Sequence, residues 1–189
     1  MHGSEEVTFA RETQVVLIPD GVPQVLPEGT RGWITQVLGG NYTVQLETGR
    51  LVRVGSADVD AIGREASAAG AVDPDAPVTP ERVWEVLRSC YDPEIPLNIV
   101  ELGLIYELML KEHAPVEGEP DGVDGVDVDI VMTLTAPGCG MGQVLADDVQ
   151  SKVRGLPGVA GVNVQLTFDP PWSPERMSEE GRLELGMFY

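Results

Sequence analysis

The segment 132–142 constrains this chain most, because it joins a strand to a helix through a turn that carries a cysteine. Apolar and polar residues alternate over 126–135, and this period of two predicts a strand. The Pro-Gly pair that follows favours a tight turn. Apolar residues over 141–153 then recur at helical spacing. The sequence therefore predicts that Cys139 lies on a strand-to-helix turn, close to the helix N-terminus.

A cysteine in this setting is expected to be reactive. Unpaired N–H groups and the positive end of the helix dipole favour the thiolate form, which is a nucleophile or a metal ligand. Glycines at 138, 140 and 142 keep bulk away from the sulfur and leave backbone amides open to a ligand. A free cysteine is also often a small buried apolar residue. The polar, glycine-rich neighbourhood favours the functional interpretation of Cys139.

Composition narrows the classes of partner. The formal net charge is −19, and such a surface repels nucleic-acid phosphates and anionic lipid, so neither nucleic acid nor membrane is expected as a partner. Two cysteines do not make a disulfide framework, which favours a reducing compartment. No secretory signal and no run of about 18 apolar residues is visible. We therefore expect a cytoplasmic protein.

The chain is expected to contain two domains. Short apolar and β-branched runs separated by glycine turns predict a small all-β, SH3-like barrel over residues 1–63. Residues 64–78 are rich in Ala, Gly, Pro and Asp and are interpreted as a linker. Residues 79–189 are expected to form an α/β domain with a three-stranded mixed sheet and flanking helices.

The α/β domain begins with a clear helix start, in which Thr79 is the N-cap and a proline follows. This helix is expected to end near Tyr91, because the residue before a proline is disfavoured in a helix. Asp92 and Glu94 then lie on a segment braced by two prolines. They are either solvated acids on a rigid connection or a preset pair of oxygen ligands or bases. Cys90 is interpreted as a core residue of the helix, and a second sulfur near the site is the alternative.

The remaining elements follow from the alternation of apolar residues and from turn signals. Strands are predicted over 102–110 and 126–135 as an antiparallel hairpin, joined by an acidic loop in which His113 is expected to be exposed. The helix after Cys139 leads to a strand over 162–168, which predicts a parallel crossover. A proline-rich arm follows, with Trp172 as a packing anchor, and then a short C-terminal helix.

Elimination leaves few chemistries for Cys139. A cysteine hydrolase needs a histidine base beside the thiol, and His2 and His113 are not convincingly placed. A structural zinc site needs about four N or S ligands, and no Gly-rich nucleotide loop is present. An iron–sulfur cluster usually takes four thiolates. One cysteine per chain can therefore take part only if the cluster bridges two protomers, or is held transiently with a carboxylate or a partner's ligand.

Three motifs resemble those of the metal–sulfur cluster biosynthesis domain. They are Tyr91–Tyr106, Met132–Cys139 and Asp169–Trp172. The domain occurs in SufT-type iron–sulfur assembly proteins, in PaaD-like proteins of phenylacetate degradation and in cytosolic iron–sulfur targeting proteins. The resemblance covers about residues 79–189, and the presence of an extra N-terminal barrel indicates a resemblance to the longer SufT-type members.

The resemblance implies an α/β domain that matures iron–sulfur proteins as a carrier or targeting adaptor rather than as an enzyme. It implies a site at Asp92, Glu94, Thr135 and Cys139, with Cys139 as the metal ligand, although Ala136 stands where some members have a second threonine. The implied partners are iron–sulfur scaffold and recipient apoproteins, and a homodimer is compatible with the ligand count. A protein–protein adaptor without metal, or a thiol-dependent enzyme, are the alternatives.

Overall fold

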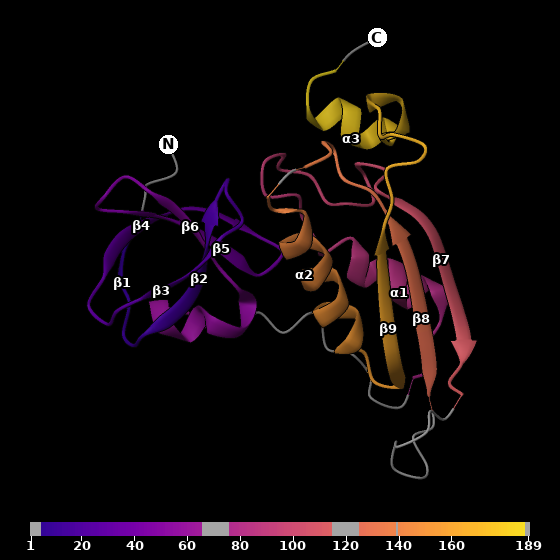
Figure 1. Ribbon diagram of the computed structural model, residues 1–189, viewed down its shortest axis with the longest axis horizontal. Coiled ribbons are helices and arrows are strands. Elements are labelled where there is room, and N and C mark those ends of the chain that lie inside the picture. The colour runs from indigo at the N-terminus through magenta and orange to yellow at the C-terminus, as the bar shows by residue number, and fades with distance from the viewer. Residues whose placement is uncertain (1–4, 66–75, 115–124, 139, 188–189) are drawn as a thin grey trace. The chain divides into compact units, whose positions relative to one another are not determined.

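The computed structural model describes residues 5–65, 76–114, 125–138 and 140–187. The chain divides into two compact units, an N-terminal one built on six strands and a C-terminal one built on three (Figure 1). The middle of the expected linker, most of the expected acidic loop and Cys139 lie outside the described residues. None of the described helices combines the length and the apolar character needed to cross a bilayer.

The N-terminal unit is an antiparallel sheet with the strand order β1-β4-β5-β6-β2-β3. Its elements are β1 (Glu5–Thr8), β2 (Thr13–Ile18), β3 (Pro23–Leu26), β4 (Arg31–Leu38), β5 (Asn41–Leu46), β6 (Leu51–Val54) and the 3₁₀ helix η1 (Ser56–Ile62). Strands β1 and β3 are the edges of this sheet among the described residues. The predicted closed, SH3-like barrel is therefore not confirmed, although the short antiparallel strands are.

The C-terminal unit contains the three-stranded mixed sheet that the sequence predicts. Its elements are α1 (Pro80–Leu87), β7 (Ile105–Glu112), β8 (Val126–Met132), α2 (Gly142–Arg154), β9 (Val159–Leu166), the 3₁₀ helix η2 (Pro174–Arg176) and α3 (Glu179–Glu184). Strand β8 pairs antiparallel with β7 and parallel with β9, so both the hairpin and the parallel crossover are confirmed.

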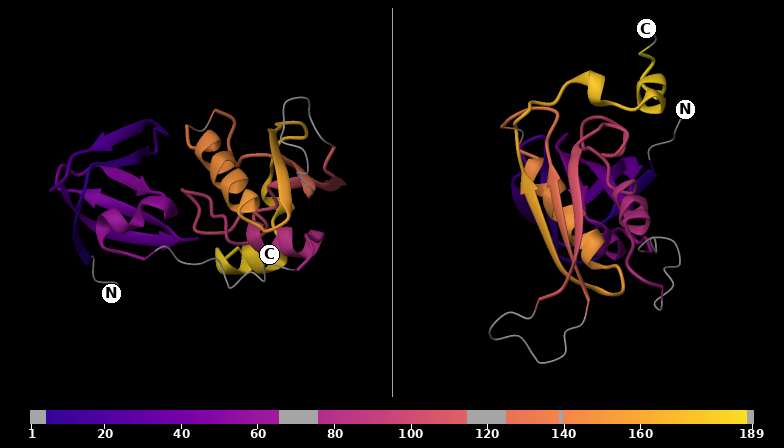
Figure 2. Two further views of the ribbon diagram at one scale, coloured as in Figure 1. Left: turned by 90° about the horizontal axis from the view of Figure 1, so that it is seen from below. Right: turned by 90° about the vertical axis from the view of Figure 1, so that its right-hand side faces the viewer.

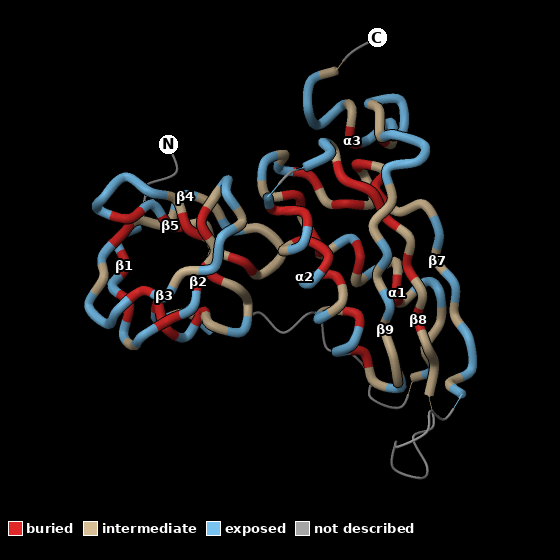
Figure 3. Tube along the Cα trace, in the orientation of Figure 1, coloured by how far each residue is buried: buried red, intermediate tan, exposed pale blue. Residues whose placement is uncertain are grey.

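Helices α1 and α2 cover one face of this sheet, as Figure 2 shows from two sides. Their apolar side chains share one core with the inward residues of β8, and Figure 3 shows buried stretches along both α2 and β8. Fully buried members of this core are Val83, Leu87, Val128, Ile130 and Val149. The alternation in β8 thus reflects one face on the core and one face without a covering helix.

Two element boundaries differ from the sequence prediction. Helix α1 does start after Thr79, whose side chain accepts a hydrogen bond from the Arg82 N–H at 3.4 Å. It ends at Leu87 rather than near Tyr91, because Tyr91 forms an antiparallel bridge with Asn98. Cys90 consequently lies beyond the helix, but it is a core residue as predicted, with no exposed surface.

Strand β7 starts at Ile105 and not at residue 102. The Asn98 side chain accepts hydrogen bonds from the N–H groups of Val100 and Glu101, which turns the chain, and Gly103 follows with a φ of 68°. The leucines before Ile105 are therefore buried in a turn, although their spacing is that of a strand.

Candidate functional site

Asp92 is a buried acid that organises the proline-braced segment. Its side chain is 5% exposed, and its Oδ1 accepts hydrogen bonds from the backbone N–H groups of Glu94 at 2.8 Å and Ile95 at 2.9 Å. The Asp92 N–H in turn bonds the Leu97 carbonyl at 3.1 Å, which closes the loop. An Asx turn of this kind fixes the backbone at the residues that follow.

Glu94 differs from Asp92 in that its side chain is exposed. It sits between the two prolines of the segment, at a backbone position held by the Asp92 carboxylate. The two acids that the sequence predicts as a pair therefore have different roles: Asp92 shapes the turn, and Glu94 is available to solvent or to a ligand.

Burial decides the protonation behaviour of Asp92. Desolvation raises the pKa of the Asp92 carboxyl above its usual value, and the neighbouring Glu94 charge adds to this, while the hydrogen bonds from Ile95 and Glu94 oppose it. The ionised form is therefore less favourable in the folded state than in the unfolded chain.

We expect Asp92→Asn to keep the turn and Asp92→Ala to lose it. The asparagine carbonyl still accepts both N–H bonds, whereas alanine leaves two half-buried donors unsatisfied, at a cost of about 2 kcal/mol in the free energy of unfolding. Because the folded pKa of Asp92 is raised, the parent loses stability relative to the asparagine variant as pH rises from about 3.8 through that folded pKa. Urea unfolding of both variants and the parent across pH 3–7 measures this. If the parent instead becomes more stable relative to the Asp92→Asn variant as pH rises over that range, the prediction is contradicted.

Backbone hydrogen bonds join the Asp92 segment to the end of β8. The Cys90 carbonyl accepts from Ile99 N–H at 2.9 Å, and the Ile99 carbonyl accepts from Leu104 N–H at 3.0 Å. The Leu104 carbonyl then accepts from Thr133 N–H at 2.8 Å. This continuous chain brings the first and second motifs to the same end of the three-stranded sheet, as Figure 1 shows.

Side-chain hydrogen bonds hold the third motif, Asp169–Trp172, at that same end of the sheet. Trp172 Nε1 donates to the Leu102 carbonyl at 2.7 Å, and the Tyr106 hydroxyl donates to the Pro170 carbonyl at 2.8 Å. The Arg176 guanidinium lies 4.1 Å from the centroid of the Tyr106 ring, a cation–π contact. Trp172 also packs against the core, so its predicted role as a packing anchor is confirmed.

Thr133 is a residue that sequence reasoning did not single out. It is fully buried, and its Oγ1 has no hydrogen-bond partner among the described residues. The adjacent Met132 carbonyl accepts from Thr167 N–H at 2.9 Å, so Thr133 lies where β8 leaves the sheet between its two neighbours. The predicted site residue Thr135 comes two positions later and is half-buried. No sequence signal indicated this burial, because Thr133 falls on the polar side of the predicted alternation.

Cys139, the principal predicted site residue, lies outside the described residues. The described chain before it leaves β8 through Ala136 to Gly138, which are exposed, and helix α2 begins at Gly142. Within the described residues, three or more His, Cys, Asp or Glu side chains do not gather into a group that could hold a metal ion. Of the four predicted site residues, the structure thus describes Asp92, Glu94 and Thr135 on segments at one end of the sheet.

The prediction that His113 is exposed was wrong. Its side chain is 6% exposed, and its Nδ1 lies 2.8 Å from Oδ1 of Asp127, near the start of β8. Gly161 makes room for this pair, since a Cβ there would come within 2.5 Å of that same oxygen. Six strand residues, about 20 Å, separate Asp127 from Thr133. His113 is therefore at the opposite end of the sheet from the three motifs and cannot act as the base for a thiol there.

Comparison with known proteins identifies the C-terminal part of the chain. A sequence model of the family described as "Iron-sulfur cluster assembly protein" matches residues 80–166. A Porphyromonas gingivalis protein named "Fe-S protein maturation auxiliary factor" is 44% identical over 108 residues, which are 57% of this chain and 91% of that protein. A Staphylococcus aureus protein named "Fe-S protein maturation auxiliary factor SufT" is 34% identical over 96 residues, which are 51% of this chain and 96% of that protein.

A solved structure, a conserved hypothetical protein from Thermotoga maritima, is 36% identical and covers 58% of this chain and 96% of its own, with a TM-score of 0.46. The sequence relatives include one of 44% identity that this chain spans almost completely. Through its C-terminal unit, the chain belongs to the SufT-type family of iron–sulfur protein maturation factors.

Proposed function

We propose that this protein helps to assemble iron–sulfur clusters and to deliver them to recipient apoproteins in the cytoplasm, as a carrier or targeting adaptor and not as an enzyme. The observation that carries the proposal is the convergence of the three family motifs at the end of β8 that leads to Cys139. The names of the relatives, which are Fe-S protein maturation auxiliary factors, support the same role.

In this proposal each of the four site residues has its own role. Cys139 is the principal ligand of the cluster or the thiol that transfers it. Glu94 offers an exposed carboxylate, and Asp92 holds the turn that presents it. Thr135 supplies a hydroxyl that can hydrogen-bond a sulfide or the thiolate.

The ligand count favours cluster binding that is shared with another chain and transient. The chain has two cysteines, and Cys90 is enclosed in the core, where its Sγ lies 3.6 Å from the Val86 carbonyl. Because a cluster usually takes four thiolates, one chain cannot complete its coordination. We infer that a second protomer, or an iron–sulfur scaffold or recipient apoprotein, supplies the other ligands, which suits a carrier that must release its cargo.

Anaerobic reconstitution tests the proposal. The full chain is incubated with ferrous iron and sulfide, desalted, and analysed for visible absorbance, iron and acid-labile sulfide, and then mixed with an apoprotein whose activity returns on cluster insertion. We expect a sulfur-to-iron charge-transfer band and recovery of that activity. A colourless protein that still binds recipient apoproteins would instead favour an adaptor without metal. Thiol-dependent turnover of a small ester would favour an enzyme.

A further inference from the structure

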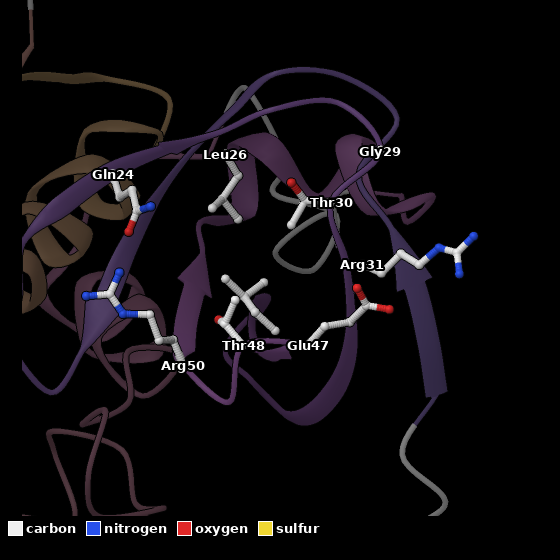
Figure 4. A pocket seen from close by; sticks show the side chains of 9 residues that line it. Gln24, Leu26, Gly29, Thr30, Arg31, Glu47, Thr48 and Arg50 are labelled. Atoms are coloured by element: carbon white, nitrogen blue, oxygen red, sulfur yellow. The ribbon is translucent and has the colours of Figure 1, made fainter.

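The N-terminal unit carries a hollow of about 340 Å³ on its surface. It is bounded by β3, by the loop that enters β4 and by the turn between β5 and β6. Figure 4 shows its lining side chains, which come from Gln24, Leu26, Gly29, Thr30, Arg31, Leu46, Glu47, Thr48 and Arg50. Its lining residues all lie before residue 80, where the match to the family begins, so the family comparison assigns the hollow no role.

Two buried leucines contribute apolar surface to the hollow. Leu26 is 3% exposed and Leu46 is 5% exposed, and both belong to the core of the unit. Gln24 and Leu26 are two positions apart on β3 and therefore lie on the same face of the strand. β3 is also an edge of the sheet, so an extended segment can lie alongside it with one side chain over the leucines.

The rim of the hollow carries two arginines, Arg31 and Arg50. Arg31 and Arg50 make no ion pair within the described part of the chain, although Arg11 of the same unit pairs with Asp58 at 2.9 Å and Asp60 at 2.7 Å. Figure 4 shows Arg50 and the Gln24 amide at one end of the hollow, with Glu47 and Arg31 at the other. The Arg50 end is thus cationic and rich in hydrogen-bond donors.

The geometry points to a docking site for an acidic, extended peptide of a partner protein. One carboxylate of the peptide would be bound by the Arg50 guanidinium and the Gln24 amide, a fork that suits a planar carboxylate. An adjoining apolar side chain would rest on Leu26 and Leu46. The net charge of −19 disfavours a polynucleotide as the occupant. A short acidic peptide meets less of this repulsion, because it carries few charges and the protein charges more than about 8 Å away are largely screened at physiological ionic strength.

Fluorescence polarisation with the full chain tests this site. The probe is a fluorescein-labelled six-residue peptide in which leucine alternates with aspartate. We expect saturable binding that weakens about fivefold or more in Arg50→Gln, since a charge-assisted hydrogen bond is lost. The matched control is Arg53→Gln, which makes the same charge change on β6 outside the hollow and should leave affinity within about twofold. A peptide with asparagine for aspartate should bind as weakly to the parent as the acidic probe binds to Arg50→Gln.

Three results would overturn the inference. They are no saturable binding at millimolar peptide, an equal loss of affinity in Arg50→Gln and Arg53→Gln, and tighter binding of a six-nucleotide single-stranded RNA than of the peptide. Arg50 is exposed, so its substitution should leave thermal unfolding unchanged. Gln24→Ala, which removes the partner amide without a change of charge, gives a second measure and should weaken the peptide about twofold or more.

Discussion

Replacing Cys139 with serine is expected to reduce the iron and acid-labile sulfide retained after anaerobic reconstitution to less than about a tenth of the parent level. A serine hydroxyl does not ionise near neutral pH and is a poor ligand for iron in a cluster. The only other sulfur of a cysteine, in Cys90, is fully buried in the core and cannot replace it. Iron and sulfide assays on desalted protein, together with the visible spectrum, measure the loss.

Cys90→Ala is the matched control for that experiment. It should retain iron and sulfide close to the parent level, while lowering the free energy of unfolding by about 1 kcal/mol because a buried side chain is shortened. If Cys139→Ser keeps its iron, or if Cys90→Ala loses it to the same extent while still folded, Cys139 is not the principal ligand.

Elements set by local chemistry could be predicted from the sequence. The start of α1 follows from Thr79 and the proline after it, and the side chain of Thr79 does cap the helix. The β7–β8 hairpin and the parallel pairing of β8 with β9 follow from alternation and from the helix between the latter two strands. In each case the residues that decide the element lie within it or at its boundary.

Boundaries set by distant contacts could not be predicted. The spacing of Leu102 and Leu104 is that of a strand, but both are buried in a turn that Asn98 initiates. The closure of the N-terminal sheet likewise depends on pairing between strands far apart in sequence, and β1 and β3 remain its edges in the described structure. Glycine turns and β-branched runs predict strands, but they do not determine which edges meet.

The candidate site, like the fold, could be predicted from the sequence only in part. The sequence indicated that Asp92 and Glu94 belong together, and their segment does lie at the end of the sheet that β8 leaves toward Cys139. It could not separate their roles, because that difference depends on which carboxylate folds back onto backbone N–H groups. The buried Thr133 hydroxyl is invisible to any spacing rule, since its burial results from segments on either side of β8.

Gly103→Ala is expected to have the largest effect on stability among substitutions of a single methyl group in the C-terminal unit. The φ of Gly103 is 68°, and an added Cβ would lie 2.1 Å from the backbone oxygen of Arg176. Left-handed backbone costs an alanine about 1–2 kcal/mol, and the clash requires the arm to shift, at about 1–3 kcal/mol more. We expect the free energy of unfolding to fall by about 3 kcal/mol, as measured by urea unfolding of the full chain.

Gly186→Ala separates the two causes, because its φ of 72° is nearly the same while no atom of the described residues lies within 4 Å of an added Cβ. The free energy of unfolding of this variant should fall by about 1–2 kcal/mol, from backbone strain alone. The difference between the two variants then measures how firmly the Asp169–Trp172 motif and the Arg176 that follows it are held against the turn that leads into β7. Equal losses would mean that the arm yields without cost, and the hydrogen bond from Trp172 to Leu102 would not hold the third motif at the end of the sheet.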